Sequence, residues 1–226
     1  MRTDLSIIIP VYNNEKTLSD LTEGILLSLD KTSHSFEILY VNDCSRDNSE
    51  IKLKELSDLH DTVRHLTLDK NGGQHQAILR GIKYCKGDKV LVMDADLQDK
   101  PSMIVPLVEA LKDDVDIVFV QREGIYQSLP RMLTSRLFKM LVRALTGLNQ
   151  KAGTYFIVHR ESAKRLLSLK CTYPFVTVML QSISTKTVYL KSQRGNNFGK
   201  SSYSFSKRAK YAFRAIYCVF QCRFQN

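Results

Sequence analysis

Residues 89–96 read Lys-Val-Leu-Val-Met-Asp-Ala-Asp, an apolar run that ends in two carboxylates separated by one residue. The turn-forming residues Lys86-Gly87-Asp88 precede the run, and a short Val- and Leu-rich segment after a turn is typical of a buried strand. A strand that ends in Asp94-Ala95-Asp96 places both acids at the carboxyl edge of a sheet, where open α/β folds bind their ligands. The stretch therefore predicts an α/β fold with a ligand site at the end of this strand.

Two neighbouring carboxylates indicate a site for a divalent cation. The side chains of Asp94 and Asp96 repel one another unless a cation lies between them, and Mg²⁺ or Mn²⁺ prefers hard oxygen ligands together with phosphate oxygens. Gln98 can add a neutral oxygen to the same ion. A bare Asp-x-Asp is often only a solvated acidic turn, but the buried strand before it and the helix start at Pro101 favour a metal–diphosphate site.

Strands and helices alternate through the first half of the chain. Strands are expected at residues 5–11, 36–42, 63–68, 89–93 and 116–120. Helices are expected at residues 16–29, 47–59, 74–84 and 101–111. Because parallel strands need helical crossovers, this order predicts a mostly parallel sheet flanked by helices on both faces, which is the α/β class.

The second half of the chain is less regular. We expect a basic amphipathic helix at residues 131–146, short strands at 154–158 and 187–190, and a last helix at 203–224. The sequence contains no internal repeat, linker or low-complexity tract. We therefore interpret it as one domain at residues 1–202 with a C-terminal basic amphipathic helix at residues 203–226.

The chain is basic, with 33 Lys and Arg residues against 23 Asp and Glu residues and a net charge of +10. This charge suits anionic partners such as nucleotides, phospholipid headgroups or nucleic acid, without choosing among them. No basic-then-apolar leader precedes the first strand, so we expect no secretory signal. No apolar stretch approaches the ~20 residues that cross a bilayer.

The cysteines are odd in number and scattered, and none forms a Cys-x-x-Cys pair. They are Cys44, Cys85, Cys171, Cys218 and Cys222. This pattern favours reduced thiols in a cytoplasmic protein over a disulfide framework or a zinc site.

Polar residues also follow the first two strands. Residues 9–15 and 41–45 each carry a strand into a turn, and either segment alone is explained by turn chemistry or by a capping Asp43. Together with the acids at residues 94–96, they lie at one edge of the predicted sheet. The arrangement predicts a cleft for a base, a ribose and a metal-bound diphosphate.

The segment Asn71-Gly72-Gly73-Gln74-His75 precedes the third helix. Its glycines allow close backbone approach, and a helix N-terminus attracts an anion. A phosphate-loop ending and a G-x-G-x-x-G after the first strand are both missing, which argues against kinases, GTPases and Rossmann dehydrogenases. We interpret His75 as a cap or cleft-lining group rather than a general base.

Taken together, five segments resemble the inverting family 2 glycosyltransferases of the GT-A fold. The polyprenyl-phosphate branch, with dolichyl-phosphate mannosyltransferases and undecaprenyl-phosphate aminoarabinose-type transferases, is the most similar. The segments are IPVYNNE at 9–15, VNDCSRD at 41–47, NGGQHQAILRG at 71–81, VMDADLQDKP at 92–101 and R…GKSSYSF at 194–205.

The resemblance implies roles for particular residues. The nucleotide sugar would be bound by Pro10, Tyr12, Glu15, Asp43, Gly72, Gln74 and Asp94, with Asp43 at the base. The cation, Mg²⁺ or Mn²⁺, would be held by Asp94, Asp96 and Gln98. Catalysis would depend on Asp94, Asp96 and Arg122. Anionic oxygens of donor or acceptor would contact Arg122, Arg131, Ser135, Arg136, Arg194, Lys200 and Ser201. A solvated basic surface is the alternative for these last residues.

One position departs from the family pattern. The family's acidic residue in a D-x-G-x-x-x-x-R segment falls at Lys151. A sugar hydroxyl needs such a carboxylate as a base, whereas a polyprenyl phosphate is already an oxyanion. The departure therefore weakens the case for a hydroxyl acceptor more than the case for a phosphate acceptor.

The expected function is metal-dependent transfer of a sugar, with inversion, from a nucleotide diphosphate sugar to an undecaprenyl-type phosphate in cell-envelope or surface glycan synthesis. One alternative is transfer to a sugar hydroxyl of a growing glycan, and another is a weakened homologue that binds only a nucleotide or a partner. We expect no nucleic-acid partner, because no reader motif is recognised. A homo-oligomer is left open.

The C-terminal helix combines an apolar stripe with a basic band. The stripe consists of Phe213, Ile216, Tyr217 and Phe220, and the band of Lys207, Lys210 and Arg214. Either the stripe packs on the sheet domain, or the helix rests on an anionic membrane surface. The second interpretation predicts a cytoplasmic protein that is peripheral at the inner face of the cell membrane.

Overall fold

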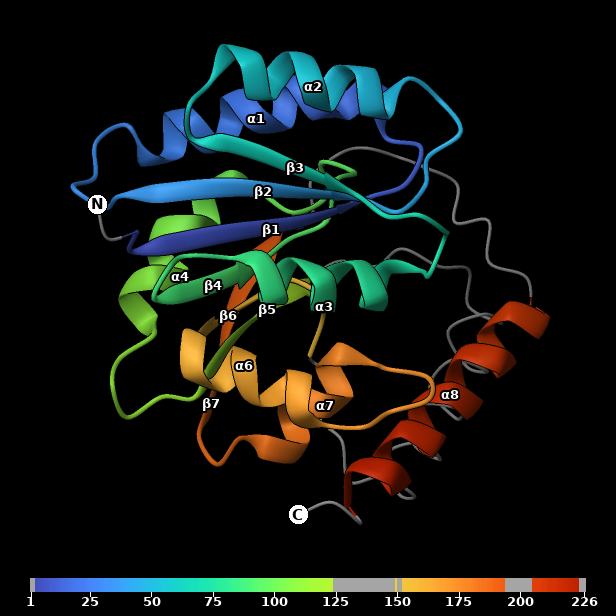
Figure 1. Ribbon diagram of the computed structural model, residues 1–226. Helices are drawn as coiled ribbons and strands as arrows, with labels where there is room; N and C mark the ends of the chain where they lie inside the picture. The colour runs from blue at the N-terminus through green and yellow to red at the C-terminus, as the bar shows by residue number, and fades with distance from the viewer. Residues whose placement is uncertain (1–2, 124–148, 150–151, 194–204, 224–226) are drawn as a thin grey trace.

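The computed structural model describes residues 3–123, 149, 152–193 and 205–223 (Figure 1). In the first part of the chain, the elements alternate as the sequence predicts. They are β1 (Leu5–Val11), α1 (Glu15–Leu29), β2 (Phe36–Asn42), α2 (Ser49–Leu59), β3 (Val63–Thr67), α3 (Gln74–Tyr84), β4 (Lys89–Val92), a 3-10 turn at Pro101–Met103 and α4 (Ile104–Ala110). The bounds predicted for β1, β2 and α3 are confirmed.

The later elements differ more from the prediction. They are β5 (Ile117–Glu123), β6 (Phe156–His159), α6 (Arg160–Ser168), α7 (Val176–Ile183), β7 (Thr187–Gln193) and α8 (Phe205–Arg223). The sequence analysis did not foresee α6 and α7, and it began β6 two residues too early. The helix expected at residues 131–146 lies outside the described residues.

The strands form one sheet in the order β3-β2-β1-β4-β6-β5-β7. Strand β6 is antiparallel to β4 and β5, and the other described pairs are parallel. The α/β class and the mostly parallel sheet are therefore confirmed. The reversed direction of β6 matters for the site, because it places the residues that enter β6 at the carboxyl edge of its neighbours.

Helices cover both faces of the sheet (Figure 1), so the inner strands are buried on both sides. One core lies under α1, α2 and α4, and the other lies under α3, α6 and α7. Strand β1 shows why both faces are apolar. Ile7 and Ile9 belong to the first core and Ile8 to the second, as the two-residue period of a strand requires.

Helix α3 packs unusually close to the sheet, which fixes the position of its N-terminus. A Cβ atom added at Gly81 would lie 2.4 Å from Cγ2 of Ile8 and 3.2 Å from Cγ2 of Val41. Only glycine allows this approach. The first residues of α3, Gln74 and His75, are thereby held at the carboxyl edge of β1 and β2.

Helix α8 packs on α7 through its smaller side chains. Ala215, Cys218, Val219 and Cys222 are buried. By contrast, Phe213 is 67% exposed, Phe220 50% and Tyr217 41%. The interpretation in which the aromatic stripe packs on the sheet domain is therefore wrong. Within the described residues, no helix has an apolar stretch long enough to cross a membrane.

Candidate active site

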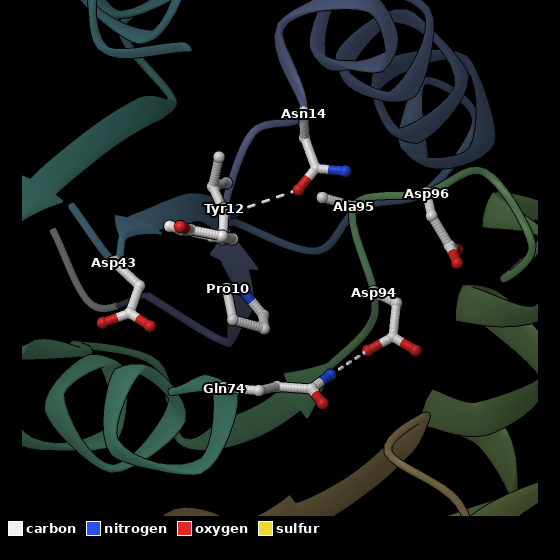
Figure 2. Close-up of a pocket in the computed structure, with 9 residues that line it drawn as sticks. Pro10, Tyr12, Asn14, Asp43, Gln74, Asp94, Ala95 and Asp96 are labelled. Carbon is white, nitrogen blue, oxygen red and sulfur yellow. Dashed lines mark hydrogen bonds between the residues drawn. The ribbon is translucent and has the colours of Figure 1, made fainter. Parts of the chain in front are cut away.

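A cleft of about 350 Å³ opens at the carboxyl edge of β1, β2 and β4 (Figure 2). Its lining comes from the ends of all three strands and from the start of α3. The lining residues are Pro10, Val11, Tyr12, Asn14, Asp43, Gln74, Asp94, Ala95 and Asp96. The structure thus brings together five of the predicted donor-binding residues, Pro10, Tyr12, Asp43, Gln74 and Asp94, together with Asp96.

The carboxylate of Asp94 is held by groups from two other segments of the chain. Nε2 of Gln74 donates to Oδ1 of Asp94 at 2.6 Å (Figure 2). The hydroxyl of Thr154 lies 3.1 and 3.0 Å from the two Asp94 oxygens. Because β6 runs antiparallel, Thr154 reaches this edge just before its strand begins. The geometry fixes the orientation of Asp94 before any ligand arrives.

The loop that carries Asp96 is held in place by a third carboxylate, that of Asp99. Asp99 is buried, and its Oδ2 accepts the backbone N–H of Asp94 at 2.9 Å. Oδ1 of Asp96 accepts the backbone N–H of Gln98 at 3.0 Å. From the helix side, the Thr17 hydroxyl donates to the carbonyl oxygen of Ala95 at 2.6 Å. These contacts hold the acidic loop against α1.

The residues present fit a hard divalent cation. Oε1 of Gln98 is buried and has no hydrogen-bond partner among the described residues. An unsatisfied buried oxygen costs about 1–3 kcal/mol, and a cation would satisfy it. Two carboxylates and an amide oxygen are the donor types that Mg²⁺ and Mn²⁺ prefer. Asp94, Asp96 and Gln98 are therefore chemically suited to the ion that the sequence predicts.

Strained backbone is concentrated at this edge. Among the described residues, the non-glycine positions with positive φ are Asn13 (56°), Cys44 (61°) and Leu97 (60°). They follow β1, β2 and β4, so each lies in a loop at the carboxyl edge. A left-handed conformation costs an ordinary residue about 1–2 kcal/mol and persists only where the surrounding structure enforces it. The loops are thus shaped at the expense of local stability.

Asp43 uses the glycine segment that was expected to hold an anion. Its Oδ1 accepts the N–H of Gly72 and its Oδ2 accepts the N–H of Gly73, both at 2.7 Å. The Asn71 side chain also donates to the Asp43 carbonyl oxygen at 2.9 Å. These two amides are therefore already engaged by a carboxylate of the protein itself. Donor binding by Gly72 stays a prediction.

Tyr12 and Asn14 face the cleft, whereas Glu15 contacts α2. Oδ1 of Asn14 accepts the backbone N–H of Tyr12 at 3.0 Å (Figure 2). The Tyr12 side chain is 44% exposed at the mouth of the cleft. Glu15 instead accepts from Asn48, through the side-chain amide at 3.2 Å and the backbone N–H at 3.4 Å. Asn14 thus occupies the position in the lining that the sequence analysis gave to Glu15.

His75 is half-buried beside this cleft, and its ring is neutral at physiological pH. Its Nδ1 accepts the backbone N–H of Val176 at 3.3 Å, and its ring centre lies 4.3 Å from that of Phe175. Burial lowers the pKa of His75 to about 4, although the negative charge of Asp94 opposes the shift. The interpretation of His75 as a cleft-lining group rather than a general base agrees with these contacts.

A second cavity of about 260 Å³ adjoins the first, because Gln74 lines both. One wall is the segment 72–76, and the other combines residues 172–175 with Arg214 of α8. The Arg214 guanidinium lies 5.1 Å from the centre of the Tyr173 ring. The second cavity therefore places one positive charge beside the cleft that contains Asp94 and Asp96.

Several predicted residues cannot be placed. Arg131, Ser135, Arg136, Lys151, Arg194, Lys200 and Ser201 lie outside the described residues. The backbone of Arg122 belongs to the end of β5, but its side chain is also outside the described part. Thr154, Asn14 and Asp99 were missed by the sequence analysis. The only signal for Thr154 was a polar residue at the start of a short strand.

Comparison with solved structures shows which fold this is. Glucosyl-3-phosphoglycerate synthase from Mycobacterium tuberculosis, in complex with Mn²⁺, uridine diphosphate and phosphoglyceric acid, aligns with a TM-score of 0.70 and 19% identity. The alignment covers 97% of this chain and 78% of that chain. The fold, with its ligand cleft at the carboxyl edge, is the GT-A fold of glycosyltransferases, as predicted.

The family follows from the sequence comparison. The model of glycosyl transferase family 2 matches residues 6–178, and the chain belongs to this family. It is a glycosyltransferase. An undecaprenyl-phosphate 4-deoxy-4-formamido-L-arabinose transferase from Pectobacterium atrosepticum is 32% identical over 222 residues, which are 96% of this chain and 67% of the relative. The transferase of the same name from Proteus mirabilis is 29% identical over 221 residues, with 95% and 67% coverage.

Proposed function

We propose that this glycosyltransferase moves a sugar from a nucleotide diphosphate sugar to an undecaprenyl-type phosphate, with inversion and with Mg²⁺ or Mn²⁺ as cofactor. The observation that carries the proposal is the pair of adjoining cavities that share Gln74. The first cavity offers oxygens for a metal-bound diphosphate, and the second offers the Arg214 cation for a phosphate acceptor. The names of the relatives support the same acceptor.

The donor would lie in the first cavity. The ion bound by Asp94 and Asp96 would neutralise charge on the departing nucleoside diphosphate. Gln74 and Thr154 keep the Asp94 carboxylate oriented, so this part of the site needs little rearrangement when the donor binds. Tyr12 and Asp43 border the same cavity, where the nucleoside would contact them.

The chemistry of His75 favours a phosphate acceptor over a hydroxyl acceptor. A hydroxyl must lose its proton to a base, but Nδ1 of His75 already accepts the Val176 N–H, and a pKa of about 4 makes the ring a weak base. A lipid phosphate carries its negative charge before the reaction. In that case the protein needs to position the acceptor and balance its charge, which Arg214 and the second cavity would do.

Helix α8 would bring the second cavity to the membrane. The exposed rings of Phe213, Tyr217 and Phe220 lie on the helix that also carries Arg214. Exposed aromatic rings on a basic amphipathic helix suit the interface of an anionic bilayer, where each nearby cation contributes about 1 kcal/mol. A peripheral position on the membrane would place the acceptor phosphate, which lies at headgroup level, close to Arg214.

The deciding experiment is mass spectrometry of lipid products. The full chain is incubated with undecaprenyl phosphate, Mn²⁺ or Mg²⁺ and a panel of nucleotide sugars. We expect a glycosylated lipid phosphate that disappears with EDTA and returns with added metal. Asp96→Asn should lower turnover by orders of magnitude, whereas Asp113→Asn, which removes an exposed carboxylate far from the cleft, should not.

Steady-state kinetics of a variant without the Arg214 charge test whether the second cavity binds the acceptor. Arg214→Gln should raise KM for the lipid phosphate more than KM for the nucleotide sugar. Lys83→Gln removes an exposed charge outside both cavities and serves as the control. Transfer only to free-sugar acceptors would establish the hydroxyl alternative. Nucleotide binding without any transfer would identify a weakened homologue, and full activity in EDTA would contradict the metal assignment.

A further inference from the structure

Beneath α8, two thiols of that helix meet a third thiol from a remote part of the sequence. Cys218 and Cys222 are buried on the inner face of this helix, and Cys171 lies in the segment between α6 and α7. The three sulfur atoms all lie within 4.8 Å of one another. The Cys171 thiol donates to Sγ of Cys218 at 2.9 Å, and Sγ of Cys218 is 4.0 Å from Sγ of Cys222.

The spacing of the sulfurs suits a thiolate metal site. Zinc–sulfur bonds of about 2.3 Å with tetrahedral angles separate the sulfurs by about 3.8 Å, and the sulfur–sulfur distances of 2.9 and 4.0 Å lie on either side of this value. Cys218 and Cys222 are separated by three residues, within the spacing common for paired zinc ligands. One helical turn presents both thiols on the same face.

We propose that Cys171, Cys218 and Cys222 bind one Zn²⁺ ion. Cys171 is partly exposed, so the fourth position would be open to water at this side of the cluster. Three thiolates and Zn²⁺ carry a net charge of −1. Arg214, one turn before Cys218, and Lys170, next to Cys171 in the sequence, supply positive charge nearby. The sequence analysis expected no zinc site because the cysteines are odd in number and scattered, with no Cys-x-x-Cys pair.

The ion would fasten the wall of the second cavity to α8. Residues 172–175 follow Cys171 directly and line that cavity together with Arg214. The same two segments are already joined by Thr172 and Gln221, which exchange hydrogen bonds of 2.9 and 3.0 Å. A metal bond to Cys171 would make this contact rigid. The proposed role of the ion is to join these two segments, and its ligands are distinct from the acids at residues 94 and 96.

Metal analysis of the full chain tests the proposal. The protein is purified under reducing conditions without chelator and assayed for zinc by mass spectrometry. We expect one Zn²⁺ per chain, and Co²⁺ in its place should give a thiolate-to-cobalt charge-transfer band, which the carboxylate site cannot produce. Cys171→Ser and Cys222→Ser should lose the band. Cys85→Ala, which removes a buried thiol elsewhere, should keep it.

A measurement on the unaltered protein covers the case in which a variant fails to fold. Alkylation of the native chain, mapped by mass spectrometry, should modify Cys171 with chelator and spare it with Zn²⁺. The proposal is overturned if the reduced protein shows no cobalt–thiolate band, if Cys171→Ser retains it, or if Zn²⁺ leaves the alkylation of Cys171 unchanged. A Cys171–Cys218 disulfide that forms in zinc-loaded protein would also contradict it.

Discussion

Acid should destabilise this protein through His75, and the size of the effect follows from its environment. The folded-state pKa of His75 is about 4, because the ring is buried, whereas the ordinary value is 6.5. Between these values the unfolded chain binds a proton that the folded protein does not. The folded pKa is lowered, so the stabilising contribution is present above pH 6.5 and is lost as the pH falls.

The largest possible change in the free energy of unfolding is the pKa difference, between 6.5 and about 4, multiplied by about 1.4 kcal/mol per pKa unit. Because the folded ring is already half protonated at pH 4, the full difference is not reached there, and we expect His75 to reduce the free energy of unfolding by about 3 kcal/mol between pH 7.5 and pH 4. The assay is urea denaturation across this range for the native chain and for His75→Asn. Asn is neutral throughout, and its side-chain oxygen can replace Nδ1 as the acceptor for the Val176 N–H.

The informative quantity is the difference between the two stability curves. Other groups titrate in both proteins, but only the native chain contains the ring of His75. The difference between the curves should change by about 3 kcal/mol from pH 7.5 to pH 4. Parallel curves, or a His75 pKa near 6.5 by nuclear magnetic resonance, would refute the argument from burial.

Three further predictions concern the site and the membrane. Thr154→Val should weaken Mn²⁺ and donor binding about 10–100-fold by calorimetry, because it removes a hydroxyl that orients Asp94, whereas Thr154→Ser should bind normally. Equal binding by both variants would exclude this role. Replacing Phe213 and Phe220 together with Ser should abolish co-sedimentation with anionic liposomes and leave the thermal transition unchanged, since these two side chains are at least half exposed. Binding that survives would locate the membrane contact elsewhere. Lys151→Ala should retain transfer to lipid phosphate, because that acceptor needs no base at this position. A protein that prefers a free-sugar acceptor would contradict this prediction.

The sequence predicts well what is determined locally. Alternating apolar runs place β1 and β2 at their observed bounds, and the position of Asp94 and Asp96 after a buried strand follows from eight residues. Gly72 and Gly73 were correctly expected before a helix. Their actual partner, Asp43, was not foreseen, because the contact joins two loops about 30 residues apart.

What the sequence could not predict depends on pairing over long distances. Thr154 reaches Asp94 only because β6 enters the sheet antiparallel, and no local pattern gives the direction of a strand. Cys171 meets Cys218 across 47 residues of sequence. The sequence also left open which face of α8 packs on the domain. The smaller residues Ala215 and Cys218 allow close packing on α7, so the large rings face outward.

The left-handed residues at the carboxyl edge have a consequence for engineering. Asn13, Cys44 and Leu97 each hold a loop in a conformation that glycine adopts at less cost. A screen for thermal stability alone would therefore favour substitutions at these loops, where relief of strain is available. Loops that relax in this way would no longer hold the side chains around the cleft in their present positions. Selection for heat resistance in this protein should consequently be paired with selection for turnover, since the same few peptide units determine both properties.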